Sequence, residues 1–178
     1  MMRNNDMAIS KGDNMKQIVT ALAGLAFLAS TPASAQQRQS PEDIANLSVK
    51  GFAQFQCAIL ASFGKVEGAN ADAHFKAGYA NMHDFITFAR ANNDKAVGQA
   101  ISAKTPMIVS MALGGPNVDF EIGRVYSEIL QFVDDELRDR ETWTHQKLDP
   151  KAPNVDPEVV IITAANKYRE KNCSIISK

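Results

Sequence analysis

The chain has 178 residues, of which 45% are hydrophobic and 22% charged, and its 19 Lys and Arg nearly balance its 20 Asp and Glu. This composition is that of an ordinary globular protein and excludes a disordered or collagen-like chain. A formal net charge of -1 gives no electrostatic reason to expect nucleic acid as a partner.

The N-terminal segment, residues 1–35, has the pattern of a secretory signal peptide. Lys16 precedes an apolar run from Ile18 to Ala29, and the small-residue cleavage site Ala33-Ser34-Ala35 follows. The run holds about twelve residues, whereas a membrane-spanning helix needs roughly twenty. We therefore predict a cleaved leader, with an uncleaved membrane anchor as the alternative.

Cleavage after Ala35 leaves residues 36–178, which have the size of a single domain. The leader carries three basic and two acidic residues, so the net charge falls from -1 to -2. Acidic residues ahead of Lys16 are unusual in a leader, which makes Met15 an alternative translation start. We expect the mature chain to be periplasmic or secreted, without a stable membrane anchor.

The only two cysteines, Cys57 and Cys173, both lie in the predicted mature domain. An exported chain enters an oxidising compartment, so an even cysteine count predicts a disulfide bond. The bond would close a loop of about 117 residues, for which the chain-entropy model gives roughly 4 to 5 kcal/mol. Two free buried thiols, or a metal or redox role, are the alternatives, although no CxxC motif is present.

Hydrophobic periodicity and helix-capping residues predict an all-α fold, a single-domain bundle of five or six helices. The predicted helices are 41–64, a second helix capped by Asn70 or Asp72 that closes at Asn92-Asn93, then 94–101, 106–113, 118–140 and a last helix that begins at Asp156-Pro157. Segment 106–113 is ambiguous, because its apolar run fits a buried strand as well as a buried short helix. The helices on either side favour a helix.

The same periodicity assigns faces to two of these helices. In helix 118–140 the apolar residues face inward, and the acidic run Asp134-Asp135-Glu136 belongs to an outer, solvated face. An acidic patch offered to a basic partner is the functional alternative for this run. In the last helix, Val159, Val160 and Ile162 are predicted to pack inward.

The residue patterns offer little chemistry. His74 and His83 are nine residues apart on one predicted helix and therefore lie on opposite faces. His145 is in a loop with no acid or thiol at ligand spacing, so we expect no metal site and no cofactor. No nucleophile elbow or metalloprotease motif is present, and no acid stands alone in an apolar context. Whether the protein is an enzyme stays open, although these patterns favour a non-enzyme.

A glycine-containing connector precedes helix 118–140. Gly114, Gly115 and Asn117 lead into a helix N-terminus, which is a suitable place for an anion. The segment lacks the P-loop lysine, and Asp119 would repel phosphate, so we interpret it as a helix connector with a ligand site as the alternative. Gly114, Gly115, Asn117 and Asp119, together with Trp143 in a later loop, form the candidate contact surface.

Two stretches, Leu113 to Tyr126 and the pair Asn172-Cys173, resemble segments of small exported bacterial helical proteins of unassigned function. The layout is also similar to that of the immunity proteins that neutralise type VI amidase effectors in the periplasm. That resemblance implies a factor that inserts a loop into the cleft of a protein partner.

Small size, export and the lack of catalytic motifs favour the same function, a protein-interaction factor such as an inhibitor or immunity protein. Its protein partner is unknown, and a homodimer is a further alternative. A carrier of a small apolar ligand and an envelope hydrolase are the other candidate functions.

Overall fold

The computed structural model describes residues 40–92 and 94–176, so the predicted signal peptide lies outside the described residues. Within these ranges the chain is all-α, with seven helices and a single isolated bridge between Arg140 and Lys147 in place of any strand. No helix in this part of the chain is long and apolar enough to cross a membrane. The helices are α1 (Pro41–Gly64), α2 (Ala71–Ala91), α3 (Lys95–Ser102), α4 (Met107–Ala112), α5 (Val118–Leu137), α6 (Pro157–Glu170) and α7 (Cys173–Ile176).

The predicted helix starts are confirmed by the capping hydrogen bonds. Ser40 and Asp43 form a reciprocal capping box at the start of α1. The side chain of Asn70 accepts from the amide of Ala73 at the start of α2, at 2.9 Å. Asp156 caps α6 ahead of a proline at the first helical position. These local bonds explain why the observed starts match the sequence pattern.

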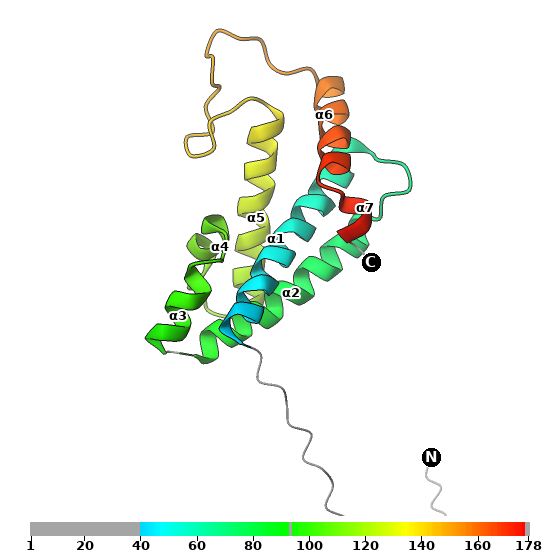
Figure 1. The fold of residues 1–178 in the computed structure, drawn as a ribbon. Coiled ribbons are helices and arrows are strands. Elements are labelled where there is room, and N and C mark those ends of the chain that lie inside the picture. The colour runs from blue at the N-terminus through cyan, green and yellow to red at the C-terminus, as the bar shows by residue number, and fades with distance from the viewer. Residues whose placement is uncertain (1–39, 93, 177–178) are drawn as a thin grey trace, which may run out of the picture. The chain divides into compact units, whose positions relative to one another are not determined.

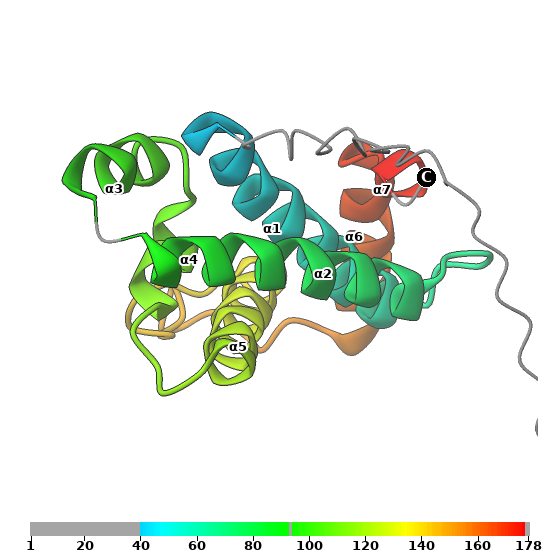
Figure 2. The same ribbon diagram turned by 90° about the horizontal axis from the view of Figure 1, so that it is seen from below.

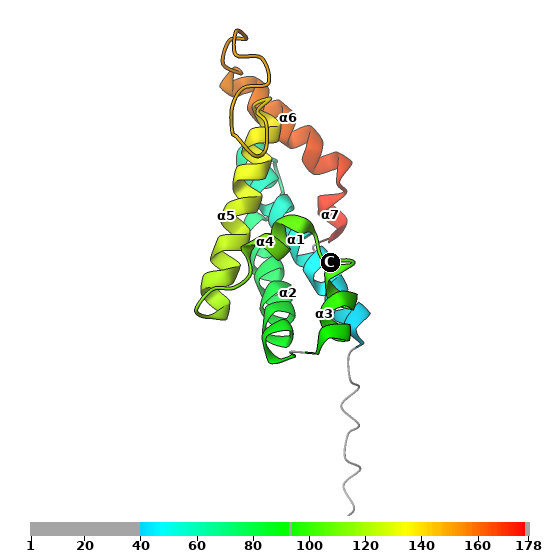
Figure 3. The ribbon, with the colours of Figure 1, turned by 90° about the vertical axis from the view of Figure 1, so that its left-hand side faces the viewer.

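Helix α1 is the centre of the domain, and it packs along α2 while also contacting α3, α5, α6 and α7 (Figure 1). Figure 2 shows α2 lying across α1, and Figure 3 shows α1 between α5 and α6. The α1–α2 approach is close enough to require glycine, because a Cβ at Gly78 would lie 2.6 Å from Cδ1 of Phe55. The two largest fully buried side chains, Phe55 and Phe85, come from these two helices.

The predicted disulfide is present between Cys57 of α1 and Cys173 of α7, with a Cα–Cα distance of 5.5 Å. Both cysteines are fully buried. The bond therefore fastens the C-terminal α6–α7 segment to the central helix.

Several predictions of burial are wrong. Helix α4 is a helix, as expected, but it is not a buried one, because Met107 and Met111 are largely exposed. In α6, Val159 and Ile162 are also exposed. The buried face of α6 is a single narrow stripe with four-residue spacing, so apolar residues off that stripe face solvent. Asp135, assigned to the outer face of α5, is fully buried.

Candidate functional site

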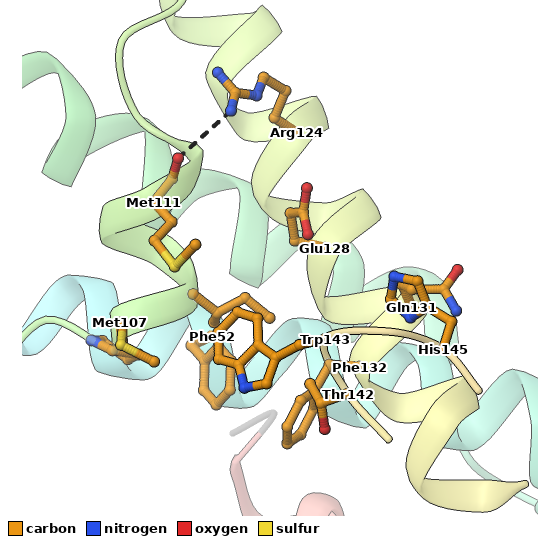
Figure 4. A pocket seen from close by; sticks show the side chains of 12 residues that line it. Phe52, Met107, Met111, Arg124, Glu128, Gln131, Phe132, Thr142, Trp143 and His145 are labelled. Carbon is orange, nitrogen blue, oxygen red and sulfur yellow. Dashed lines mark hydrogen bonds between the residues drawn. The ribbon is translucent and has the colours of Figure 1, made fainter. Parts of the chain in front are cut away.

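A pocket of about 450 Å³ opens between α4, α5 and the loop that follows α5 (Figure 4). Its size falls in the range of small-molecule sites, which is roughly 300 to 1,000 Å³. One side chain of α1 also reaches it. The lining residues are Phe52, Pro106, Met107, Ile108, Met111, Arg124, Glu128, Gln131, Phe132, Thr142, Trp143 and His145.

The apolar wall of the pocket comes from the exposed face of α4 and from Trp143. Met107 and Met111 are four residues apart and therefore lie on one helix face, while Val109 and Ala112 turn toward the core. Methionine side chains are flexible and polarisable, so they adapt to the shape of an apolar group. Trp143 reaches the pocket from the loop that follows α5, and its side chain is 60% exposed.

The loop that carries Trp143 is held by a dense set of hydrogen bonds around Glu141. The carboxylate of Glu141 accepts from the amides of Trp143 at 3.0 Å and Thr144 at 2.5 Å. Hydrogen bonds from Thr144, with a further one from the Trp143 amide, lower the pKa of Glu141. The backbone of Glu141 also pairs with Gln146 and His145, each at 2.8 Å. Trp143 is therefore presented on a preorganised loop.

Asp135 is the polar centre beneath this loop. Its carboxylate is fully buried and accepts from Nε2 of Gln131 at 3.0 Å and from Nδ1 of His145 at 2.6 Å. The prediction that Asp135 lies on a solvated face is therefore wrong. The contact of His145 with Asp135 was not expected from the sequence. The loop folds back over the end of α5 and covers Asp135, which is a tertiary effect that periodicity does not contain. His145 reaches this position with a backbone φ of 57°, a conformation that non-glycine residues adopt at an energetic cost.

The pair of Asp135 and His145 has the arrangement in which a carboxylate orients an imidazole. A general base at Nε2 of His145 would also need a positioned nucleophile and donors for a developing oxyanion. The other polar groups that line the pocket are Glu128, the amide of Gln131, the hydroxyl of Thr142 and the guanidinium of Arg124.

The structure does not bring the predicted contact residues together. Trp143 lines the pocket, whereas Gly114, Gly115 and Asn117 belong to the connector before α5 and Asp119 to the first turn of α5. The side chain of Asn117 caps α5 by accepting from the amide of Phe120 at 2.8 Å. Asp119 accepts from the hydroxyl of Tyr79, and this hydrogen bond raises the pKa of Tyr79.

A buried acid that was not predicted from the sequence, Glu121, stabilises the same connector. Glu121 is 1% exposed, and its carboxylate accepts from the amide of Gly115 at 2.9 Å and from Arg90 at 2.5 Å. Arg90 also donates to the carbonyls of Gly115 and Pro116. The polar groups of the connector are therefore engaged by the protein itself.

The other two histidines lie apart from the pocket and, as predicted, on opposite faces of α2. His74 is buried, with Nε2 3.0 Å from the hydroxyl of Tyr168, and burial lowers its pKa. His83 is exposed, and its nearest charged neighbour is Asp84, at 3.7 Å. Across residues 40–92 and 94–176, no three His, Cys, Asp or Glu side chains are grouped to hold a metal ion.

Comparison of the chain with protein-family models, with curated proteins and with solved structures finds no match. Function is therefore inferred from the geometry of the pocket.

Proposed function

We propose that this chain is an exported binding protein that holds a small, largely apolar ligand in the pocket between α4, α5 and the Trp143 loop. The observation that carries the proposal is the convergence of three exposed apolar side chains, Met107, Met111 and Trp143, on one concave site. Large apolar side chains gathered at one solvated site mark a binding surface.

The rigidity of the Trp143 loop supports the same function. Ordering a mobile loop on binding costs free energy, and a loop that is already ordered avoids most of that cost. The hydrogen bonds around Glu141 are made by groups of the loop itself. Trp143 therefore offers a large aromatic surface at a small entropic cost.

Export is supported by two independent features. Residues 1–35 have the sequence pattern of a signal peptide. The buried disulfide between Cys57 and Cys173 is typical of proteins that fold in an oxidising compartment.

A protein-interaction factor, such as an inhibitor or immunity protein, is the second candidate. It is favoured by the exposure of Trp143 and of Leu148 on the same loop, because tryptophan is enriched at the energetic centres of protein interfaces. The sequence pattern put this function first, but a pocket with both apolar walls and polar groups favours the small ligand.

The proposal can be tested with Trp143, which is the only tryptophan of the chain and reports directly on the pocket. The oxidised protein is titrated with a neutral apolar dye, N-phenyl-1-naphthylamine, and energy transfer from Trp143 is recorded. We expect saturable binding with one site. Met111→Gln should weaken it by about tenfold, since a polar amide would replace part of the apolar wall.

The matched control is Ile162→Gln, an equally exposed apolar residue on α6 outside the pocket. Equal affinity of the two variants would place the dye elsewhere and contradict the proposal. If no dye binds, but a stoichiometric protein co-purifies from envelope extract and is lost in Trp143→Ala, the second candidate is favoured.

A further inference from the structure

We infer that the ligand carries a primary ammonium group on an apolar body, an inference that rests on the pocket being the ligand site. The relevant feature is the cluster of polar side chains formed by Glu128, Gln131 and His145 in the lining of the pocket. The buried carboxylate of Asp135 lies behind this cluster and sets its polarity.

A carboxylate can only accept hydrogen bonds, so both partners of Asp135 must donate to it. Gln131 donates its amide NH₂, which directs the amide oxygen away from Asp135. His145 donates from Nδ1, which directs Nε2 away from Asp135. One buried acid thereby orients both side chains.

Glu128 adds a charged acceptor to the same side. It forms no ion pair or hydrogen bond with any other part of the described chain, and it lines the pocket from α5, between Arg124 and Gln131 (Figure 4). Arg124, one turn earlier on α5, is directed to the carbonyl of Met111 at 3.4 Å, at the far end of the pocket. Because Arg124 is directed to Met111, the carboxylate of Glu128 is the lining charge without a partner in the described chain, so the local charge favours a cation.

The remaining walls fit the body that carries such a cation. Phe52, Phe132 and Trp143 supply aromatic rings, and the two methionines of α4 supply thioether groups. Aromatic faces attract an ammonium group as well as an apolar chain. A carboxylate ligand would instead meet the negative charge of Glu128. The volume of about 450 Å³ suits a small free amine, and we commit to that occupant.

The test compares three ligands that share one body and differ only in the head group: 4-phenylbutylamine, 4-phenylbutanol and 4-phenylbutanoate. Each is titrated into the oxidised full chain at neutral pH, and the fluorescence of Trp143 and the heat of binding are recorded. We expect the amine to bind at least about tenfold more tightly than the alcohol, with the carboxylate weakest. Added salt should weaken the binding of the amine alone.

Two variants identify the charge that is responsible for the preference for the amine. Glu128→Gln should reduce the affinity for the amine by about tenfold and leave the alcohol unchanged. Glu170→Gln, an exposed acid on α6 that does not line the pocket, is the matched control and should change neither. Both variants alter surface positions, so folding is checked by an unchanged helical circular dichroism spectrum.

The outcomes separate this inference from the proposed function. If none of the three ligands binds, and the neutral dye also fails, the pocket is not a ligand site. If the alcohol or the carboxylate binds as tightly as the amine, the pocket binds apolar ligands without choosing a cation, and the inference is wrong. Tighter binding of an Nα-acetylated lysine amide than of 4-phenylbutylamine would identify a protein lysine as the occupant and overturn the commitment to a free amine.

Discussion

Replacing both Cys57 and Cys173 by alanine tests how the disulfide stabilises the domain. The two cysteines are separated by 116 residues, and the chain-entropy model gives between about 4 and 5 kcal/mol for a loop of that length. Native domains are stable by only about 5 to 15 kcal/mol, so we expect the bond to account for a large share of the total. Alanine is the suitable replacement because both positions are fully buried and a serine hydroxyl would lack a partner.

The measurement is urea unfolding of the oxidised protein and of the double variant, followed by circular dichroism and by Trp143 fluorescence. We expect the variant to lose roughly 3 to 5 kcal/mol, with unfolding at a lower urea concentration. A loss below about 1 kcal/mol would refute the loop-closure reasoning. Hydrogen exchange adds a second criterion. If only the amides of α6 and α7 lose protection, the bond fastens one segment locally rather than restricting the unfolded chain.

Three further predictions concern glycine contacts and buried polar groups. Gly78→Ala should destabilise the protein by about 1 to 3 kcal/mol in urea unfolding, because of its close contact with α1. Gly123→Ala, with nothing within 4 Å of the added Cβ, should stabilise α5 by about 0.5 to 1 kcal/mol; equal effects of the two would contradict the packing argument. Glu121→Gln should cost about 1.5 to 3 kcal/mol by weakening the charge-assisted bond from Arg90, and an unchanged melting temperature would show that the buried charge is dispensable. Burial lowers the pKa of His74, so as pH falls the unfolded chain takes up a proton before the folded one, and stability should fall as pH drops below about 6.5. Between pH 7.5 and 5, His74→Phe should therefore lose less stability than the wild type. A larger loss in the variant would show that the pKa of His74 is not lowered by folding.

The features that the sequence predicts are those decided by neighbours along the chain. Ser40, Asn70, Asp94, Asn117 and Asp156 each cap the helix that follows, through side-chain bonds to amides two or three residues later. Such bonds need no tertiary contact, so the capping residue alone indicates the boundary. The disulfide is also predictable, because two cysteines in a chain with the sequence pattern of an exported protein allow one intramolecular pairing.

The burial of acids in α5 could not be predicted in the same way. The stripe of Ile122, Val125, Ile129 and Val133 is buried as its spacing predicts. Asp135 lies off that stripe and is covered only because the loop after α5 returns over the helix. Loop paths of this kind depend on contacts between distant residues, which hydrophobic periodicity does not record.

A second stripe on α5 is a sequence signal for the pocket. Arg124, Glu128, Gln131 and Asp135 are spaced by four, three and four residues, so they share one helix face beside the apolar stripe. If this helix face contacted only solvent, no other part of the chain would pack against it. Here α4 and the Trp143 loop lie against it and form the pocket. A continuous polar stripe bordering an apolar one is therefore the pattern from which this site could have been anticipated.

Asp135→Asn tests whether the buried acid sets the polarity of the pocket or only anchors the loop. The amide has nearly the same shape, and its oxygen can still accept from Gln131, but its NH₂ would donate to Nδ1 of His145. His145 would then carry its proton on Nε2 and offer a donor to the pocket. We expect the preference for 4-phenylbutylamine over 4-phenylbutanol to fall by about tenfold while the neutral dye binds as before. Imidazole nitrogen chemical shifts report the tautomer directly, so a switched tautomer with an unchanged amine preference would show that Asp135 anchors the loop without choosing the ligand.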